Sequence, residues 1–365
     1  MKLYSKLKRT PLFFRLSLIA LILSGTLHLL FRLSMTVSDL FNRSVGAFFR
    51  LLLARLTGWI PFSVAEILLT VVLPLLIILA ILVCAIHNLR RYRRALFFVF
   101  LSLPCAVYLL FVLTFAAGYS TSPLAERVSL KRAPVSGESL YTTAAILVDE
   151  IEALENEIEN HSNGSSEMPF SFEELNAQLI DSYQRLVGRI DGLHTYSVPA
   201  KPILLSRPMV YTHITGVYSF FTGEANVNTA YPDYVQVYTT AHELAHQRGI
   251  AREDEANFVA FLACIEAEHP YIRYCGYMNL LEYVSIALYT ADPESYTDLT
   301  LSFNSTIRSE LYGYQSFLAD YENNMIGDIS NGFNDAYLTV QGTPGVESYG
   351  LVVDLAVAYF QNQIQ

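Results

Sequence analysis

The sequence predicts an α-helical membrane anchor followed by a mainly helical (α+β) domain with a small β-sheet. Three observations support this fold class: a long apolar and basic first third, an acidic remainder, and a short strand-like region before an amphipathic helix. Of the 365 residues, 52% are hydrophobic and 16% are charged, which is too apolar for an ordinary soluble protein. We therefore expect a membrane domain, residues 1–118, and a second domain, residues 119–365.

The charges are divided unevenly along the chain. Residues 1–119 contain 13 Lys and Arg and only two acids, whereas residues 120–365 contain 11 Lys and Arg and 32 acids. A basic apolar region joined to an acidic region is typical of a membrane anchor that carries a water-exposed domain. Because an acidic domain without a basic stripe repels nucleic acid, we expect no nucleic-acid partner.

Three apolar runs are long enough to cross a bilayer, which takes about 20 helical residues. They cover roughly residues 12–33, 62–86 and 95–118. A cleaved signal peptide is the competing interpretation of the first run. That run is long, however, and no convincing small-residue cleavage site follows it, so we expect an uncleaved anchor. The sequence thus predicts a multi-pass protein of the cytoplasmic membrane, with the lipid bilayer as a partner.

Basic flanks predict how these spans are oriented. Residues 2–9 and residues 90–94 each contain four Lys or Arg, and short loops rich in these residues stay in the cytoplasm. Because the number of spans is odd, residues 119–365 are expected outside the membrane, together with the loop at 34–61. Apolar residues in that loop have helical spacing. The loop is therefore expected to lie along the membrane surface or to pack on the spans.

Periodicity outlines the second domain. Residues 119–135 have the composition of a linker, and the region 198–228, rich in Val, Tyr, Phe and Thr and interrupted by Pro and Gly, predicts short strands. The remaining apolar patterns have helical spacing. The expected strands lie near 203–205, 217–221 and 225–228, and the expected helices lie at about 136–160, 171–190, 252–267, 271–290, 293–321 and 349–363.

The pattern H-E-x-x-H at residues 242–246 is the most informative motif. Pro232 suits the first turn of its helix, and Gly249 suits the residue just beyond the helix end. His242 and His246 are one turn apart and point the same way, so they can bind one Zn²⁺ ion. Glu243 beside them can take a proton from water, which makes it the candidate catalytic residue.

A catalytic zinc ion takes three protein ligands, so a third must come from nearby. Acids follow directly after Gly249, at the start of the next helix. Glu253 and Asn257 share one face of that helix, so Glu253 can bind the metal while Asn257 hydrogen-bonds a ligating histidine. Glu255 points about 200° away from Glu253, and it is the second candidate. His213 and His269 are weaker alternatives.

Two further questions stay open at this point. The cysteines Cys264 and Cys275 lie in a domain expected outside the cytoplasm, where a disulfide is permitted but not required. A tyrosine that donates to a developing oxyanion is also conceivable, and the candidates are Tyr274, Tyr277 and Tyr349.

The metal motif resembles known families. Residues 253–257, E-D-E-A-N, are similar to the E-x-x-A-D motif that follows H-E-x-x-H in glutamate-liganded zincin metallopeptidases, with Asn257 in place of Asp. The longer run at 242–258 resembles an uncharacterised family of bacterial multi-span membrane proteins. Other runs that resemble this family lie at residues 61–66, 221–228, 334–338 and 348–350.

This resemblance implies a zincin-like extracytoplasmic domain that hydrolyses peptide bonds in a peptide or protein substrate. It implies His242, His246 and Glu253 as zinc ligands and Glu243 as the base. Only six residues separate His246 from Glu253, fewer than in many such enzymes. The resemblance also implies that residues 221–228 form an edge strand for the substrate backbone. The alternative is a membrane sensor or scaffold that binds zinc or peptide without cleaving it.

Overall fold

The chain divides into two compact units in this computed structural model. The first unit consists of residues 1–121 with 219–224, and the second consists of residues 122–218 with 225–365. The residues that the structure describes are 10–131, 134–158, 165–322 and 324–364.

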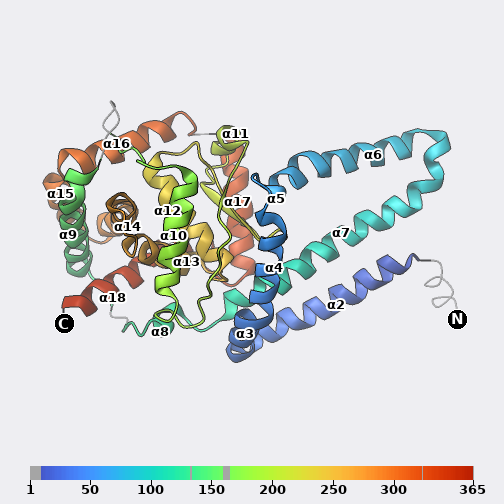
Figure 1. Cartoon of the computed structure of the whole chain (residues 1–365), viewed down its shortest axis with the longest axis horizontal. Helices are drawn as coiled ribbons and strands as arrows, with labels where there is room; N and C mark the ends of the chain where they lie inside the picture. The colour runs from blue at the N-terminus through green and yellow to red at the C-terminus, as the bar shows by residue number, and fades with distance from the viewer. Residues whose placement is uncertain (1–9, 132–133, 159–164, 323, 365) are drawn as a thin grey trace. The chain divides into compact units, whose positions relative to one another are not determined.

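Three helices of the first unit are long and apolar enough to cross a membrane (Figure 1). They are α2 (Leu12–Leu33), the continuous helix Val64–Ala85, and α7 (Arg93–Thr114). Each has 22 residues, about 33 Å at 1.5 Å per residue, which matches the hydrocarbon thickness of a bilayer. The helix Val64–Ala85 comprises α5 (Val64–Ile67), the π-helical turn η2 (Leu68–Val72) and α6 (Leu73–Ala85). The three predicted spans are thereby confirmed as candidate membrane helices. The basic residues expected before the first span, Lys2, Lys6, Lys8 and Arg9, lie outside the described residues.

The segment between the first two spans is helical and presents its apolar side outward. It contains α3 (Met35–Phe41), the π-helical turn η1 (Asn42–Gly46) and α4 (Ala47–Gly58). Leu40 and Phe48 are 70% and 61% exposed, whereas Asn42 and Arg50 are buried. Most of this apolar side therefore does not pack on the spans, although the ring centre of Phe41 lies 4.8 Å from that of Phe31 in α2. The exposed apolar side favours the first of the two expected arrangements, in which the segment lies along the membrane surface and contacts lipid.

Arg50 ties this segment to the end of the third span. Its guanidinium donates hydrogen bonds to Oδ1 and the carbonyl of Asn42, both at 2.8 Å, and to the carbonyl of Thr114 at 2.7 Å. A buried guanidinium is tolerated when several acceptors satisfy its N–H groups. The last carbonyls of a helix have no partner within the helix, so Arg50 also completes the end of α7.

The sheet of the second unit is small and precedes the helix that carries the H-E-x-x-H motif, as predicted. Its strands are β1 (Lys201–Pro202), β2 (Gly216–Ser219) and β3 (Glu224–Val227), in the order β1-β3-β2. Strand β1 runs parallel to β3. The expectation that residues 221–228 form an edge strand is wrong, because β3 has a partner on both sides. Strands β1 and β2 are at the two edges of the sheet.

Helices make up most of the second unit (Figure 1). Three of them, α12, α13 and α14, contain most of the fully buried side chains, and Phe258, Phe261, Tyr271 and Tyr274 are among the largest of these. The helices are α8 (Leu124–Arg127), α9 (Gly137–Leu154), α10 (Phe172–Leu186), α11 (Ser206–Val210), α12 (Asp233–Gln247), α13 (Glu253–Ile265), α14 (Pro270–Ala291), α15 (Pro293–Ser302), α16 (Ser305–Ala319), α17 (Met325–Val340) and α18 (Val352–Ile364).

Some elements differ from the sequence prediction. The helix expected at 293–321 is two helices: α15 ends at Ser302, and Asn304 caps α16 by accepting a hydrogen bond from the N–H of Ile307 at 2.9 Å. The expected linker 119–135 contains α8, whose Leu124 is fully buried. Helix α17 was not predicted. Gly327 and Gly332 weaken its helical pattern, and its apolar residues Ile329 and Phe333 remain exposed.

Candidate metal centre

Helix α12 places the two motif histidines. It runs from Asp233 to Gln247, and every residue after Asp233 is buried. Gly249, with φ of +91°, follows the helix end, and the N–H of Ile250 bonds back to the carbonyl of Ala245 at 3.2 Å. Glycine adopts a positive φ with little strain, so the chain can reverse direction here. The reversal brings the start of α13 back toward the last turns of α12.

Two buried side chains hold the last turns of α12 in place. The Tyr183 hydroxyl donates to the carbonyl of Ala241 at 2.6 Å. Arg248 donates to the carbonyls of Leu244 at 3.0 Å and Tyr196 at 2.8 Å, and its guanidinium carbon lies 4.1 Å from the centre of the Tyr183 ring. These contacts satisfy carbonyls near the helix end, and they add a cation at the negative end of the helix dipole.

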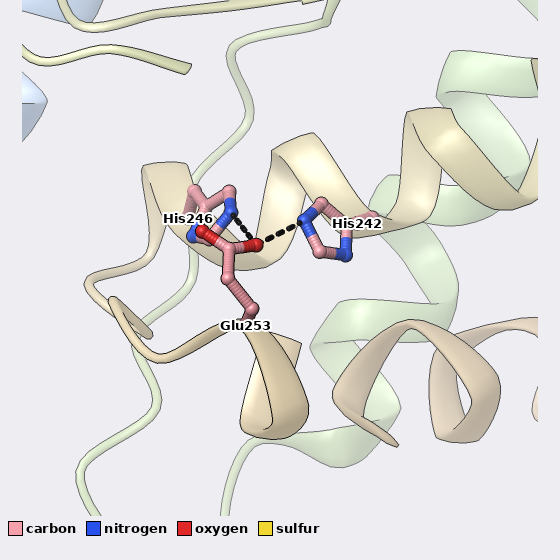
Figure 2. A group of neighbouring side chains, drawn as sticks. All are labelled: His242, His246 and Glu253. Carbon is pink, nitrogen blue, oxygen red and sulfur yellow. Dashed lines mark ion pairs between the residues drawn. The ribbon is translucent and has the colours of Figure 1, made fainter. Parts of the chain in front are cut away.

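His242, His246 and Glu253 converge in a buried group (Figure 2). Nε2 of His242 lies 3.2 Å from Oε2 of Glu253, and Nε2 of His246 lies 3.3 Å from the same oxygen. Both histidines come from α12, and Glu253 is the first residue of α13. One potential ligand atom from each residue lies within 4.8 Å of the other two.

The hydrogen bonding of His246 fixes its tautomer in the neutral state. Nδ1 of His246 lies 2.7 Å from the carbonyl of Ile250. A carbonyl oxygen only accepts, so Nδ1 carries the proton and donates it. Nε2 of the neutral ring then has a lone pair that faces the Glu253 carboxylate. Two electron-rich atoms at this distance need a proton or a cation between them, and a metal ion fills that requirement.

The group fits zinc in donor type and spacing. Two imidazole nitrogens and one carboxylate oxygen form a common catalytic zinc set. Ligands at about 2.0–2.1 Å from a tetrahedral ion are separated by roughly 3.4 Å, close to the two His–Glu separations of 3.2 and 3.3 Å. Among the described residues, Oε2 of Glu253 is a buried oxygen without a hydrogen-bond partner. The residues present therefore fit a Zn²⁺ ion.

The other candidate ligands are engaged elsewhere. Oε1 of Glu255 accepts the N–H of Leu124 at 2.6 Å and pairs with Arg252. His269 caps α14 by accepting the N–H of Tyr271 at 3.1 Å. His213 Nε2 lies 3.0 Å from the carbonyl of Tyr321. Of the alternatives, the structure brings Glu253, not Glu255, to the two histidines.

Glu243 lies beside this group and is buried. Its Oε2 atom has no hydrogen-bond partner within the part of the chain that the structure describes. Burial raises the pKa of Glu243 to about 8, although His246 nearby and the N–H of Tyr218, which hydrogen-bonds the carboxylate, both lower it. A carboxyl group that titrates near neutral pH is suited to accept and release protons.

Asn257 lies one turn after Glu253 and supports the group from the other side. Its side chain hydrogen-bonds His242 and also the Tyr283 hydroxyl, and its carbonyl accepts the Tyr238 hydroxyl at 2.7 Å. A polar residue that holds a histidine of a metal group fixes the direction of the ring. The spacing of Asn257 from Glu253 predicts this position.

The two histidines differ in their affinity for a proton. Burial, followed by the charge of His246, lowers the pKa of His242. Burial also disfavours the charged form of His246, but the Glu253 carboxylate outweighs this and raises the pKa of His246 to about 9. Without a metal ion, a proton on His246 balances the charge of Glu253, whose pKa is lowered by His246 despite its burial. Metal binding would displace this proton.

A cavity of about 400 Å³ adjoins the metal group in the second unit. His242 and Glu243 lie in its wall, and so does Gly216 of the edge strand β2. Most other wall residues come from helices α12, α14 and α17. Wall residues that were not predicted as site residues include Tyr238, Thr239, Asn279, Glu282, Tyr283, Tyr314, Ser330, Asn331 and Asn334.

The sequence contained only weak signals for these residues. Asn279, Glu282, Tyr283 and Ile286 have the spacing of one helix face, but a polar face is usually only a solvated one. Asn334 begins one of the runs used for the family resemblance. Tyr274, a candidate oxyanion donor, instead donates to Glu310 at 2.9 Å.

The cysteines of the second unit are buried free thiols. Neither Cys264 nor Cys275 forms a disulfide, and burial raises the pKa of both thiols. Both side chains are buried among the helices of the second unit, and they do not form the disulfide that the sequence permits.

Comparison with known proteins gives one match. The pattern of a family described as "Protein of unknown function (DUF3810)" matches residues 41–357. The chain belongs to the DUF3810 family. This confirms the predicted resemblance to a family of unknown function. No curated protein and no solved structure matches the chain.

The DUF3810 match extends over residues of both units. It includes the second and third candidate spans, the sheet, and all residues of the buried His/His/Glu group. The description of the DUF3810 family names no activity, so a function has to be argued from the site itself.

Proposed function

We propose that this chain is a membrane-anchored, zinc-dependent metallopeptidase that hydrolyses peptide bonds outside the cytoplasmic membrane. One observation carries the proposal: two histidine nitrogens and a carboxylate oxygen converge at 3.2–3.3 Å beside a buried glutamate that has an unsatisfied oxygen. Metal binding alone would not require Glu243. A buried carboxyl group next to three metal ligands is the arrangement that general base catalysis needs.

In this mechanism the residues of the chain have separate roles. His242, His246 and Glu253 would hold Zn²⁺, which supplies Lewis-acid chemistry by polarising a carbonyl group and making water more acidic. Glu243 would accept a proton from the attacking water and pass it to the departing amine nitrogen. Asn257 would keep His242 in the orientation that presents Nε2.

The substrate would bind in the cavity beside β2. This strand is at the edge of the sheet, and an edge strand can pair with an extended peptide through backbone hydrogen bonds. The cavity volume of about 400 Å³ accommodates a few side chains. These features support a peptide or a protein segment as the substrate class.

The proposed location follows from the spans and their charged flanks. With an odd number of spans and an arginine-rich loop at 90–94 in the cytoplasm, residues 119–365 would lie outside the membrane. We propose residues 1–118 as the membrane domain and residues 119–365 as the zincin-like catalytic domain.

The test combines metal analysis with a peptidase assay. The full chain is purified in detergent, its zinc content is measured by elemental analysis, and a broad peptide library is incubated with the parent and with Glu243→Gln. We expect one Zn²⁺ per chain in both proteins and turnover only in the parent, with a loss of at least about 100-fold in the variant.

Two outcomes would contradict the proposal. Equal turnover by parent and variant would exclude Glu243 as the base. Zinc binding without any turnover in the parent would instead indicate a membrane sensor or scaffold that binds zinc or peptide. Turnover that depends on Glu243 distinguishes the enzyme from such a binder.

A further inference from the structure

The β2–β3 hairpin is shared between the two units. Its turn and the adjoining strand ends, residues 219–224, belong to the first unit, whereas the rest of both strands belongs to the second unit. We call residues 219–224 the hairpin tip. The hairpin tip is described with the helices of the first unit, and the stem is described with the metal group of the second unit.

Glu224 anchors the hairpin tip within the first unit. Oε1 of Glu224 accepts the N–H of Val64 at 3.0 Å, and Oε2 accepts the N–H of Ala65 at 2.9 Å. These are the first two residues of the span Val64–Ala85. The first N–H groups of a helix lack partners within the helix and lie at the positive end of its dipole. A buried carboxylate with two such donors is firmly held.

Two threonines from other helices of the first unit hold the same tip. The Thr57 hydroxyl of α4 lies 3.2 Å from the carbonyl of Thr222, and the Thr114 hydroxyl at the end of α7 lies 3.0 Å from the carbonyl of Phe220. Each hydroxyl shares its one hydrogen between this carbonyl and a carbonyl of its own helix, that of Leu53 at 3.2 Å or that of Leu110 at 2.7 Å. The hairpin tip is thus hydrogen-bonded to three helices of the first unit, which are α4, α5 and α7.

Gly223 allows the tip to approach α4 closely. It has φ of +73°, and a Cβ atom at this position would lie 2.5 Å from the backbone nitrogen of Ala54. No other residue type fits this approach without displacing the chain. The hairpin tip is therefore packed closely against helix α4.

The stem of the hairpin touches Glu243 within the second unit. A Cβ atom on Gly216 would lie 2.7 Å from Oε1 of Glu243 and 2.6 Å from Cγ2 of Thr239. The N–H of Tyr218 hydrogen-bonds the Glu243 carboxylate. Strand β2 thus sets both the space available to this carboxylate and one of its hydrogen bonds. Tyr218 is followed directly by Ser219, which is the last residue of β2 and the first residue of the hairpin tip.

We propose that Glu224 is a positioning residue for Glu243. By holding the hairpin tip, Glu224 fixes the end of strand β2 along the chain, so that the Tyr218 N–H stays aimed at the Glu243 carboxylate. The consequence for turnover rests on the proposed peptidase function, whereas the effect on strand β2 does not.

The test uses two variants that release the tip and one that does not. Glu224→Gln replaces one of the two acceptor oxygens with a donor, and Thr114→Val removes the bond to Phe220 with little change in shape. Ser63→Ala is the matched control. Ser63 Oγ accepts the N–H of Glu66 at 3.0 Å at the same helix end, so its loss weakens that helix start without touching the tip.

Hydrogen exchange of the full chain in detergent is the primary measurement. We expect the peptide that contains Tyr218 to exchange about fivefold to tenfold faster in Glu224→Gln and in Thr114→Val than in the parent, as the loss of about one net hydrogen bond implies. In Ser63→Ala this peptide should exchange as in the parent, while the start of the span exchanges faster. Zinc content should be the same in all four proteins.

The outcomes separate the two claims. Unchanged exchange at β2 in both Glu224→Gln and Thr114→Val would overturn the positioning role, as would an equal increase in Ser63→Ala. If the parent cleaves peptides, the two tip variants should lose kcat with KM unchanged; a loss of turnover caused only by loss of zinc would also overturn the inference. If the parent cleaves nothing, the proposed function fails but the exchange result still decides the role of Glu224.

Discussion

Two glutamates in the first turn of α13 have different surroundings, although they are only two residues apart. Glu253 faces two imidazole nitrogens, and Glu255 accepts a backbone N–H and pairs with an arginine. Both are buried acids at a helix start, where the helix dipole favours negative charge. Their roles can therefore be separated by experiment.

We expect Glu253→Gln to lower zinc affinity by at least about 100-fold, because the amide is a poor substitute for an anionic ligand. Glu255→Gln should keep zinc affinity within a few fold of the parent but lower the melting temperature, since it weakens a buried, charge-assisted bond to Leu124. Competition with a chromogenic chelator measures the affinities. Loss of zinc in Glu255→Gln alone would assign the third ligand to Glu255.

Glu282 gives a prediction on stability and pH. Burial raises its pKa from 4.5 to about 7 although the Tyr234 hydroxyl, at 2.6 Å, donates to it. Below pH 4.5 the group is protonated in both the folded and the unfolded chain and costs nothing. Between pH 4.5 and about 7 the unfolded chain ionises first, so stability falls as pH rises, and above pH 7 the loss is constant.

Glu282→Gln removes this cost and keeps an acceptor for Tyr234. We expect the variant to exceed the parent in free energy of unfolding by about 1–3 kcal/mol at pH 8 and by much less at pH 5. Thermal unfolding in detergent at both pH values measures the difference. Glu268→Gln is the control, because its side chain is 87% exposed and should give no pH-dependent gain. A gain of equal size at pH 5 would contradict the burial argument.

Much of the candidate site could be predicted from local spacing. His242, Glu243 and His246 share one helix, and Glu253 and Asn257 follow directly on the next, so two helical periods and Gly249 placed all five residues. The wall residues Tyr283 and Asn331 could not be found in this way, because they reach the cavity only through the packing of distant helices. Gly216 was noticed only as an interruption, since its function depends on what lies opposite it.

At the level of elements, the site depends on how closely β2 approaches α12. A Cβ atom on Gly216 would overlap Thr239 and Glu243, with distances of 2.6 and 2.7 Å. Thr239 and Glu243 are four residues apart on α12, so both side chains lie on the helix face that meets the strand. The strand and the helix are therefore fitted to each other at this glycine.

We expect Gly216→Ala to cost about 1–3 kcal/mol of stability by overpacking and to reduce turnover more than zinc content. Gly332→Ala is the matched control: it lies within α17 and a Cβ atom there meets nothing within 4 Å. Alanine should stabilise that helix by about 0.5–1 kcal/mol. Thermal unfolding and zinc analysis of both variants test this. Equal behaviour of the two variants would show that β2 can shift freely away from α12.

Elements that follow strong signals were predicted best. The three candidate spans and helices α12 and α13 have continuous apolar patterns, and the structure confirms them. Helix α17 was missed because its apolar residues are separated by glycine and asparagine and stay exposed, so its pattern resembles that of a loop. The edge strand was misassigned because pairing order in a sheet is a tertiary property. Nothing in residues 198–228 indicates that β1 joins β3 instead of leaving it at the edge.

At the level of the whole molecule, the two parts of the chain differ in net charge, and this difference bears on how the chain inserts into a membrane. The acidic second part of the chain carries a net charge of −21, and the apolar first part carries +11. Positive loops are retained in the cytoplasm, and a large acidic domain can be translocated. The same distribution supports the proposed orientation, in which the acidic second part lies outside the membrane.

Reporter fusions test this orientation directly. Alkaline phosphatase is active only outside the cytoplasmic membrane, and green fluorescent protein is fluorescent only inside when exported unfolded. We expect a fusion after Gln365 to give high phosphatase activity and no fluorescence, because three spans separate it from a cytoplasmic start. A fusion after Asn88, which follows the second span, should give the opposite pattern. The third span alone then accounts for the change of side.

The arginines of the loop between the second and third spans provide the control. Replacing Arg91, Arg93 and Arg94 with Gln removes most of the positive charge that holds this loop inside. The fusion after Gln365 should then lose phosphatase activity in part, as a fraction of the chains inserts the other way. High fluorescence of the parent fusion after Gln365 would place the metal group in the cytoplasm. In that case the reducing environment would match the free, buried thiols of Cys264 and Cys275, and substrates would have to be sought among cytoplasmic peptides.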